Sequence, residues 1–321
     1  MLSNEAQSAI ATRHASSRNY WAISLRRLLR KKVGVACLTI ILLMYGSGVL
    51  APLVTPYGYN DQDLSITKQG PSISHPFGTD RLGRDILTRI IYGLRTTVII
   101  TVVTLVTGSL ALGITMGLLA GYFGKWIDTL VMRVGEVTSA FPEIFLVLII
   151  ISTLKPPITD WVRGIEETVG IDIIRLGVVD YFVLSLALAI FSWFGMARLV
   201  RGQVLQAREN QYVEAARAIG ASTPRILTKH VLPNVMGPVI VMVSAGLAGV
   251  AGSEIFLSFL GIGIQPPTPS LGLMIFQNGS ISVLRSDPHL LLFPVLTLSL
   301  LLFTFNLLGD AVNDAFNPRA R

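Results

Sequence analysis

Six stretches of the chain are rich enough in apolar residues to form transmembrane helices. Crossing the ~30 Å hydrocarbon core of a bilayer takes about 20 residues of helix. Five stretches reach that length, at residues 33–54, 97–119, 181–200, 235–260 and 290–308. A sixth, 144–154, is too short to cross alone, so we extend it back through Pro142 to residue 137. This span then contains Glu143, which must face protein because charge at membrane depth is costly.

The pattern therefore predicts an all-α integral membrane protein with six transmembrane helices. The polar segments give the rest of the predicted organisation: a cytoplasmic tail with an amphipathic helix (1–32), a first transmembrane helix (33–54), an extracytoplasmic loop (55–96), a transmembrane core (97–313) that contains a cytoplasmic loop (201–233), and a cytoplasmic tail (314–321). Residues 20–32 suit a helix lying in the membrane interface, or a plain basic anchor. Because no A-x-A site follows the first span, we expect an uncleaved anchor rather than a signal peptide.

Composition and charge support the membrane assignment. Apolar residues make up 51% of the chain and charged residues 14%, whereas soluble domains carry about 25% charged residues. This excludes an ordinary soluble enzyme and a disordered chain. With the N-terminus inside, the cytoplasmic segments hold 17 of the 26 Lys and Arg residues, so the positive-inside rule predicts an N-in, C-in topology. The net charge of +7 therefore requires no nucleic-acid partner.

Sequence motifs for catalysis or ATP binding are missing. No G-x-x-x-x-G-K-[ST] loop occurs, so we expect that the chain does not bind ATP itself. H-E-x-x-H, G-x-S-x-G and C-x-x-C are also missing. The four histidines, at 14, 75, 230 and 289, have no partner at metal-ligand spacing. We expect a non-catalytic protein with no metal or cofactor of its own.

The cytoplasmic loop at 201–233 is the most informative segment. It predicts a helix near 211–219, a break at Gly220, and a second helix entered through Pro224, since proline suits an early helical position. We expect a further break before Pro233, which separates this unit from the next span. A helix–turn–helix between two spans is a surface on which a soluble partner can dock.

The residues of this loop resemble the E-A-A-x3-G-x9-I-x-L-P loop of permease subunits from ATP-binding-cassette (ABC) importers. The match, at full spacing, consists of Glu214, Ala215, Ala216, Gly220, Leu232 and Pro233. His230 departs from it, because the general pattern has Ile there. Three more segments resemble the peptide-transport branch: HPFGTDRLGRD at 75–85, LSFLGIGIQPPTPSLG at 257–272 and the final FNLLGDAVNDAFNP. In the second of these, Leu271 stands where that branch has Trp.

The resemblance runs from about residue 75 to 318. It implies the C-type permease subunit of an oligopeptide or dipeptide importer, with the type I ABC importer permease fold, in the bacterial inner membrane. Nickel and glutathione systems belong to the same family and stay open as alternatives. The implied partners are a B-type permease subunit, cytoplasmic ATPase subunits that carry ATP and Mg, and an extracytoplasmic substrate-binding protein. A secondary transporter is the alternative from another class, but it would need internal repeats and several buried acids.

In this family the E-A-A loop is a coupling helix that sits in a cleft of the ATPase. The resemblance therefore implies that Glu214 makes a charged contact with the ATPase and that Gly220 forms the turn between the two short helices. The full set of expected coupling residues is Glu214, Ala215, Ala216, Arg217, Gly220, Arg225, His230, Leu232 and Pro233.

Residues outside this loop give weaker signals. The segment before the second span predicts turns and a folded-over structure that anchors the span, with Arg84 as an alternative ligand for a peptide carboxylate. Its residues are His75, Gly78, Thr79, Asp80, Gly83, Arg84 and Asp85. Glu254 and Asn306 lie within spans and are candidates for the transport pathway or a subunit interface.

Small residues recur at every fourth position of two spans, which allows close helix approach in lipid. The two stripes are Ser109, Gly113, Gly117 and Gly121 in the second span, and Ala245, Gly249 and Ser253 in the fifth. We expect most of this packing to be internal to the subunit. The outer loop at 155–178 suggests a short amphipathic helix, which either caps the bundle or docks a partner.

Overall fold

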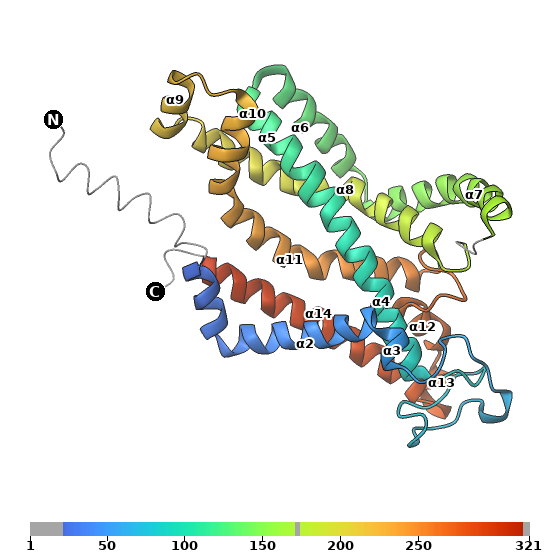
Figure 1. Cartoon of the computed structure of the whole chain (residues 1–321). Helices are drawn as coiled ribbons and strands as arrows, with labels where there is room; N and C mark the ends of the chain where they lie inside the picture. Colours follow the sequence, from blue (N-terminus) through green and yellow to red (C-terminus); the bar gives the residue numbers. More distant parts are fainter. Residues whose placement is uncertain (1–21, 171–173, 317–321) are drawn as a thin grey trace.

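A computed structural model describes residues 22–170 and 174–316, and the described chain is built of helices and their connections (Figure 1). The tail at 1–19, Tyr20 and Trp21 of the amphipathic segment, residues 171–173 of the outer loop and the last residues, 317–321, lie outside this description. Residues 22–30 are helical, as the amphipathic pattern predicts. Lys31 forms an ion pair with Asp314 (Nζ–Oδ2 2.7 Å), which joins the start of the first span to the end of the last.

The helices run in chain order through the bundle. The longer ones are α2 (Lys32–Val49), α4 (Ile86–Thr104), α5 (Ile114–Phe123), α6 (Lys125–Ala140), α7 (Glu143–Val169), α8 (Val178–Ala207), α11 (Leu232–Phe259) and α14 (His289–Phe316). The shorter ones are α3 (Ala51–Val54), η1 (Leu64–Ile66), α9 (Gln211–Ala218), α10 (Thr223–Arg225), α12 (Leu271–Asn278) and α13 (Ile281–Ser286). Two π-helical segments, η2 (Leu105–Gly113) and η3 (Ile226–Val231), join α4 to α5 and α10 to α11.

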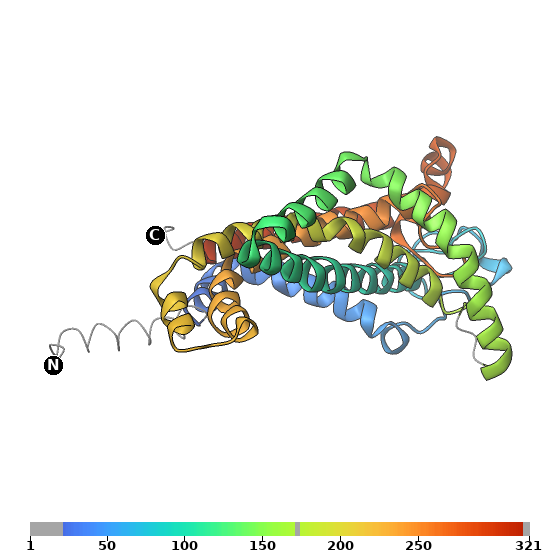
Figure 2. The same cartoon turned by 90° about the horizontal axis from the view of Figure 1, so that it is seen from above.

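Six helical stretches of the described chain are long and apolar enough to cross a membrane, which confirms the predicted number. They are Lys32–Val49, Ile86–Phe123, Glu143–Thr168, Val178–Ala207, Thr223–Phe259 and His289–Phe316. One end of the bundle carries the start of α2, the turn between α5 and α6, the α9–α10 unit and the end of α14 (Figures 1 and 2). The α3–α4 connection, α12 and α13 lie at the other end. This grouping is the one that an N-in, C-in topology requires.

The second and fifth spans are longer than predicted. The second begins at Ile86 rather than 97 and has 38 residues, which at 1.5 Å per residue is about 57 Å. The hydropathy pattern did not show the first turns of this span, because they contain a charged residue, Arg89. The Arg89 side chain is nevertheless buried, at 3% exposed, and lies near Asp80 (Nε–Oδ2 3.6 Å). The predicted break before Pro233 is wrong. Pro233 follows shortly after the π-helical η3, and the helix continues through both from Thr223 to Phe259.

The third span begins and ends later than predicted: it starts at Glu143 rather than at 137, and it runs on to Val169 rather than ending at 154. The chain breaks at Phe141 and Pro142, both in extended conformation, so the helix does not continue back through Pro142 to residue 137. The break fits the preference of a residue before proline for extended backbone. Two helices result: α6 packs Gly135 against Phe194 in the middle of α8, and α7 packs Val147 and Ile151 in the cluster formed with the outer half of α8. The predicted outer helix is a continuation of α7.

Helix α8 is the centre of the bundle. It packs against α4, η2, α5, α6, α7 and α11. The small-residue stripe of the second span makes this possible: a Cβ on Gly117 would lie 2.7 Å from the carbonyl oxygen of Ala197, and one on Gly113 2.6 Å from the Cβ of Met196. The expectation of internal packing is therefore confirmed for this stripe. In the fifth span, Ala245 also packs internally, against Gly309 of α14.

Candidate functional site

The cytoplasmic unit is a helix–turn–helix, as predicted. Helix α9 ends in a Schellman motif, in which Ala221 N donates to Ala216 O (3.0 Å) and Gly220 N donates to Arg217 O (2.9 Å). Gly220 has φ +75°, a left-handed conformation that glycine adopts without steric cost. Val213 and Ala216 are buried in the bundle, whereas Glu214 and Ala215 are exposed. The unit therefore presents one face of α9 to the outside of the chain.

Two features of this unit are not visible in the sequence motif. Ile219, 84% exposed, lies in the turn beside Gly220. Arg217 faces the bundle, because its guanidinium lies 5.1 Å from the ring centroid of Tyr122, at the end of α5. Arg217 thus connects α9 to the second span.

The remaining expected coupling residues are spread along the second half of the unit. Arg225 is exposed in α10, His230 is half-buried in η3, and Leu232 and Pro233 begin α11. The structure therefore groups Glu214, Ala215, Ala216, Arg217 and Gly220 on α9 and its turn, and places Arg225, His230, Leu232 and Pro233 on the following helix. Their contact with an ATPase stays a prediction.

The outer segment before α4 is held by its own polar side chains. Asp85 caps α4 by accepting a hydrogen bond from Thr88 N (2.7 Å), and its second oxygen lies 3.0 Å from His75 Nδ1. Asp80 accepts from the Arg84 backbone N (3.0 Å) and from the Arg84 side chain (Nε 2.8 Å, Nη2 2.7 Å). With its guanidinium bound in this way, Arg84 does not offer the free cation that a peptide carboxylate would need.

Glycines and a threonine complete this fold-over. Gly78 and Gly83 have positive φ, and a Cβ on Gly83 would lie 1.8 Å from the carbonyl oxygen of Asp63. The Thr79 hydroxyl donates to Ile66 O and accepts from Gln69 N (2.9 Å).

One ion pair ties the fold-over to the end of the bundle, between Lys68 Nζ and Asp287 Oδ2 (3.1 Å). A hydrogen bond from the Ser286 hydroxyl lowers the pKa of the Asp287 carboxyl, and Lys68 adds to this effect. This is the geometry of an anchoring segment.

Glu254 lies in the interior of the chain, and its part in the transport pathway or in a subunit interface stays a prediction. It is 0% exposed. Its carboxyl accepts hydrogen bonds from Thr97 (2.8 Å) on α4, Ser258 (3.0 Å) on α11 and Ser270 (3.2 Å) before α12. These bonds fasten three segments together at the outer part of the bundle. Asn306, by contrast, is exposed on α14 and donates to Leu302 O (2.8 Å).

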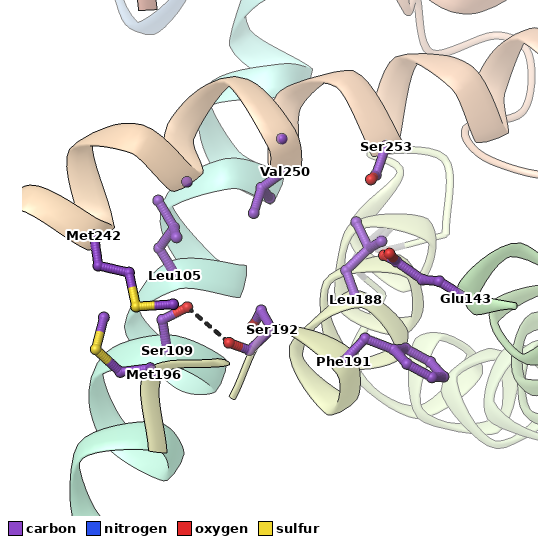
Figure 3. A pocket seen from close by; sticks show the side chains of 12 residues that line it. Leu105, Ser109, Glu143, Leu188, Phe191, Ser192, Met196, Met242, Val250 and Ser253 are labelled. Atoms are coloured by element: carbon purple, nitrogen blue, oxygen red, sulfur yellow. Dashed lines mark hydrogen bonds between the residues drawn. The ribbon is translucent and has the colours of Figure 1, made fainter. Parts of the chain in front are cut away.

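A cavity of about 250 Å³ lies between η2, α8, α11 and the start of α7 (Figure 3). Glu143, Ser253, Ser109 and Ser192 supply polar groups, and Met196 and Met242 belong to its apolar wall. Sequence reasoning placed Glu143 inside a continuous helix. The signal that could have corrected it was Pro142, because an acidic residue directly after a proline break is typical of the first turn of a helix.

No group of His, Cys, Asp and Glu within 22–170 and 174–316 has the arrangement of a metal site. The polar groups described above can hold helices together, dock a partner or contact a passing solute.

Comparison with known proteins places the chain in a family. Residues 113–321 match the binding-protein-dependent transport system inner membrane component family, and residues 19–71 match the N-terminal transmembrane domain of oligopeptide transport permease C. The dipeptide transport system permease protein of Bacillus subtilis is 36% identical over 95% of this chain and 88% of its own length. The glutathione transport system permease protein of Pectobacterium atrosepticum is 35% identical (96% and 94%), and the oligopeptide transport system permease protein of Haemophilus influenzae 33% (95% and 90%).

The family match covers the coupling unit, Glu254 and most of the residues that line the cavity, and the relatives align over nearly the whole chain. The six spans of the described chain are consistent with a family of inner membrane components. The chain belongs to the family of inner membrane components of binding-protein-dependent transport systems and is a multi-pass permease protein of the bacterial inner membrane.

Proposed function

We propose that the chain is the C-type permease subunit of an ATP-driven importer of dipeptides or oligopeptides. The similarity to dipeptide and oligopeptide permease proteins supports this, because it extends over 95% of the chain. Glutathione, carried by the system of another relative, is itself a tripeptide. Peptide import is therefore the substrate class that these relatives share.

The proposed energy source is a pair of cytoplasmic ATPases, because the chain has no phosphate-binding loop of its own. Helix α9 offers the docking surface, with Glu214 exposed and without a side-chain partner in the described structure. Closure of the ATPases moves this unit. The bundle then moves as a rigid body against a second, B-type permease subunit, which switches access from outside to inside. An extracytoplasmic binding protein delivers the peptide to the end that carries the α3–α4 segment.

Peptide uptake by the assembled transporter tests this proposal. The chain is expressed with its partner subunits, and uptake of labelled dipeptide, oligopeptide, glutathione and Ni²⁺ is compared. We expect peptide uptake that depends on ATP. Uptake of Ni²⁺ without peptide uptake would contradict the proposed substrate class.

Two variants test the docking role of α9. Glu214→Lys reverses the exposed charge, and Gly220→Pro is incompatible with φ +75°. We expect both variants to insert but to lose at least tenfold in ATPase co-purification and peptide uptake. The matched control is Glu167→Lys, an exposed charge reversal in α7 at the other end of the bundle, which should retain the ATPase. Normal ATPase retention by stably inserted Glu214→Lys would exclude this contact.

A further inference from the structure

Glu143 is a carboxylate within a membrane span, and nothing in the described structure neutralises it. No hydrogen bond or ion pair within 22–170 and 174–316 involves its side chain, which borders the cavity between α7, α8, α11 and η2. An ionisable residue at membrane depth is costly unless it pairs or faces water, and such residues mark solute pathways. The partner of Glu143 therefore comes from outside the chain.

A second unpaired polar group faces the same cavity. The hydroxyl of Ser253 on α11 has no hydrogen-bond partner among the described residues, although a serine in a helix usually bonds to its own backbone. Figure 3 shows Ser253 and Glu143 on one side of the cavity and Met196 and Met242 on the other. The site thus has one anionic acceptor and one free hydroxyl at one end, and two methionines with the hydrogen-bonded Ser109 at the other.

The part of the cavity wall that α11 forms includes two glycines, which leave space beside them. Gly246 and Gly249 line the cavity, and a Cβ on Gly249 would meet nothing within 4 Å. Gly113 and Gly117 differ from Gly249, because they are in close contact with α8 and leave no free space. Methionine side chains adapt their shape to different apolar neighbours. The cavity can therefore accept groups of varied shape beside one fixed negative charge.

We propose that this cavity is a transient binding site for the N-terminal ammonium group of a peptide in transit, with Glu143 as its counter-ion and Ser253 as a hydrogen-bond acceptor. The inference rests on the proposed function. Peptides of different sequence share only their backbone and their termini, so a site that serves many of them must use those groups. A carboxylate between apolar walls attracts a cation more strongly than one in bulk water.

The test uses the assembled transporter in proteoliposomes and two probes that differ only in the amino group, trialanine and propionyl-dialanine. We expect Glu143→Gln to lower trialanine uptake about tenfold, which corresponds to about 1.4 kcal/mol, and to leave uptake of propionyl-dialanine at its wild-type rate. Glu143→Asp should retain most trialanine uptake. The matched control is Glu136→Gln, an exposed acid on α6 paired with Arg133 (2.9 Å), which should leave both rates unchanged.

A second measurement removes the dependence on the binding protein. Equilibrium dialysis of both probes against the permease–ATPase complex alone should show that Glu143→Gln weakens the affinity for trialanine only. The inference would be overturned if Glu143→Gln weakened the affinity for both probes equally or for neither. It would also be overturned if the two permease subunits dissociated in Glu143→Gln, because the counter-ion of Glu143 would then be a cation of the partner subunit. If the wild-type complex neither binds nor imports peptide, the proposed function itself fails, and the inference fails with it.

Discussion

Two glutamates in the spans of this protein have opposite environments. Glu254 is 0% exposed and accepts hydrogen bonds from three hydroxyl groups on three segments. Glu143 starts a helix at the edge of a cavity and has no partner within the described structure. A buried acid with all its bonds made holds helices in place, whereas an acid without partners is available to a ligand. The same residue type thus serves structure in one place and, in our proposal, transport in the other.

Removing Glu254 should have the largest effect on stability. Glu254→Ala leaves a cavity, removes the acceptor of the Ser258 and Ser270 hydroxyls and leaves Thr97 only its longer bond to Gly93 O (3.3 Å), so we expect a loss of about 3 kcal/mol or more in the free energy of unfolding. Thermal unfolding of the purified permease complex measures this loss. Glu143→Ala is the control and should unfold near the wild-type temperature. Equal unfolding temperatures for both variants would remove the distinction between the two acids.

Removing one partner of Glu254 should have a smaller effect. Thr97→Val keeps the shape of the side chain and deletes one hydrogen bond (2.8 Å), so we expect a loss of about 1 kcal/mol. Thr129→Val, which deletes an exposed bond to Lys125 O (3.1 Å), is the matched control. In the double variant with Glu254→Ala, the loss from Thr97→Val should disappear, because the two residues share one bond. Full additivity would show that the bond contributes nothing.

Neutralising Glu143 should have the smallest effect on stability. Glu143→Gln breaks no contact in the described chain, so the free energy of unfolding should stay within about 0.5 kcal/mol of wild type. The measurement is the same thermal unfolding, carried out on the full complex without peptide. A large drop would mean that Glu143 holds the complex together, and the comparison with Glu254 would then lose its meaning.

The helices and the coupling unit were predictable because their signals are local. Apolar run length gives six spans, and Gly220 with Pro224 gives the turn and the start of the second helix. The start of α4 at Ile86 was not predictable from hydropathy, because the buried Arg89 makes its first turns look polar. Hydropathy averages over a window and does not detect that a charge is buried beside an acid.

The candidate site was less predictable than the fold, because it depends on contacts between distant segments. Nothing near Glu254 in the sequence indicates that Thr97 reaches it from 157 positions away. Likewise, the sequence pattern does not separate the open Gly249 from the packed Gly117, since both belong to stripes of small residues. Spacing shows that close packing is possible, and only the tertiary structure shows what each glycine faces.

The uninterrupted helix from Thr223 to Phe259 has a mechanical consequence. Its 37 residues span about 55 Å at 1.5 Å per residue. It begins beside the turn at Gly220 and carries both Gly249 and Glu254 near its far end. Such a rod acts as a lever: a tilt of about 10° about its middle displaces each end by about 5 Å in opposite directions. A push at the cytoplasmic end then reaches the cavity wall through one continuous helix, which can bend at the π-helical η3 and at Pro238 inside α11.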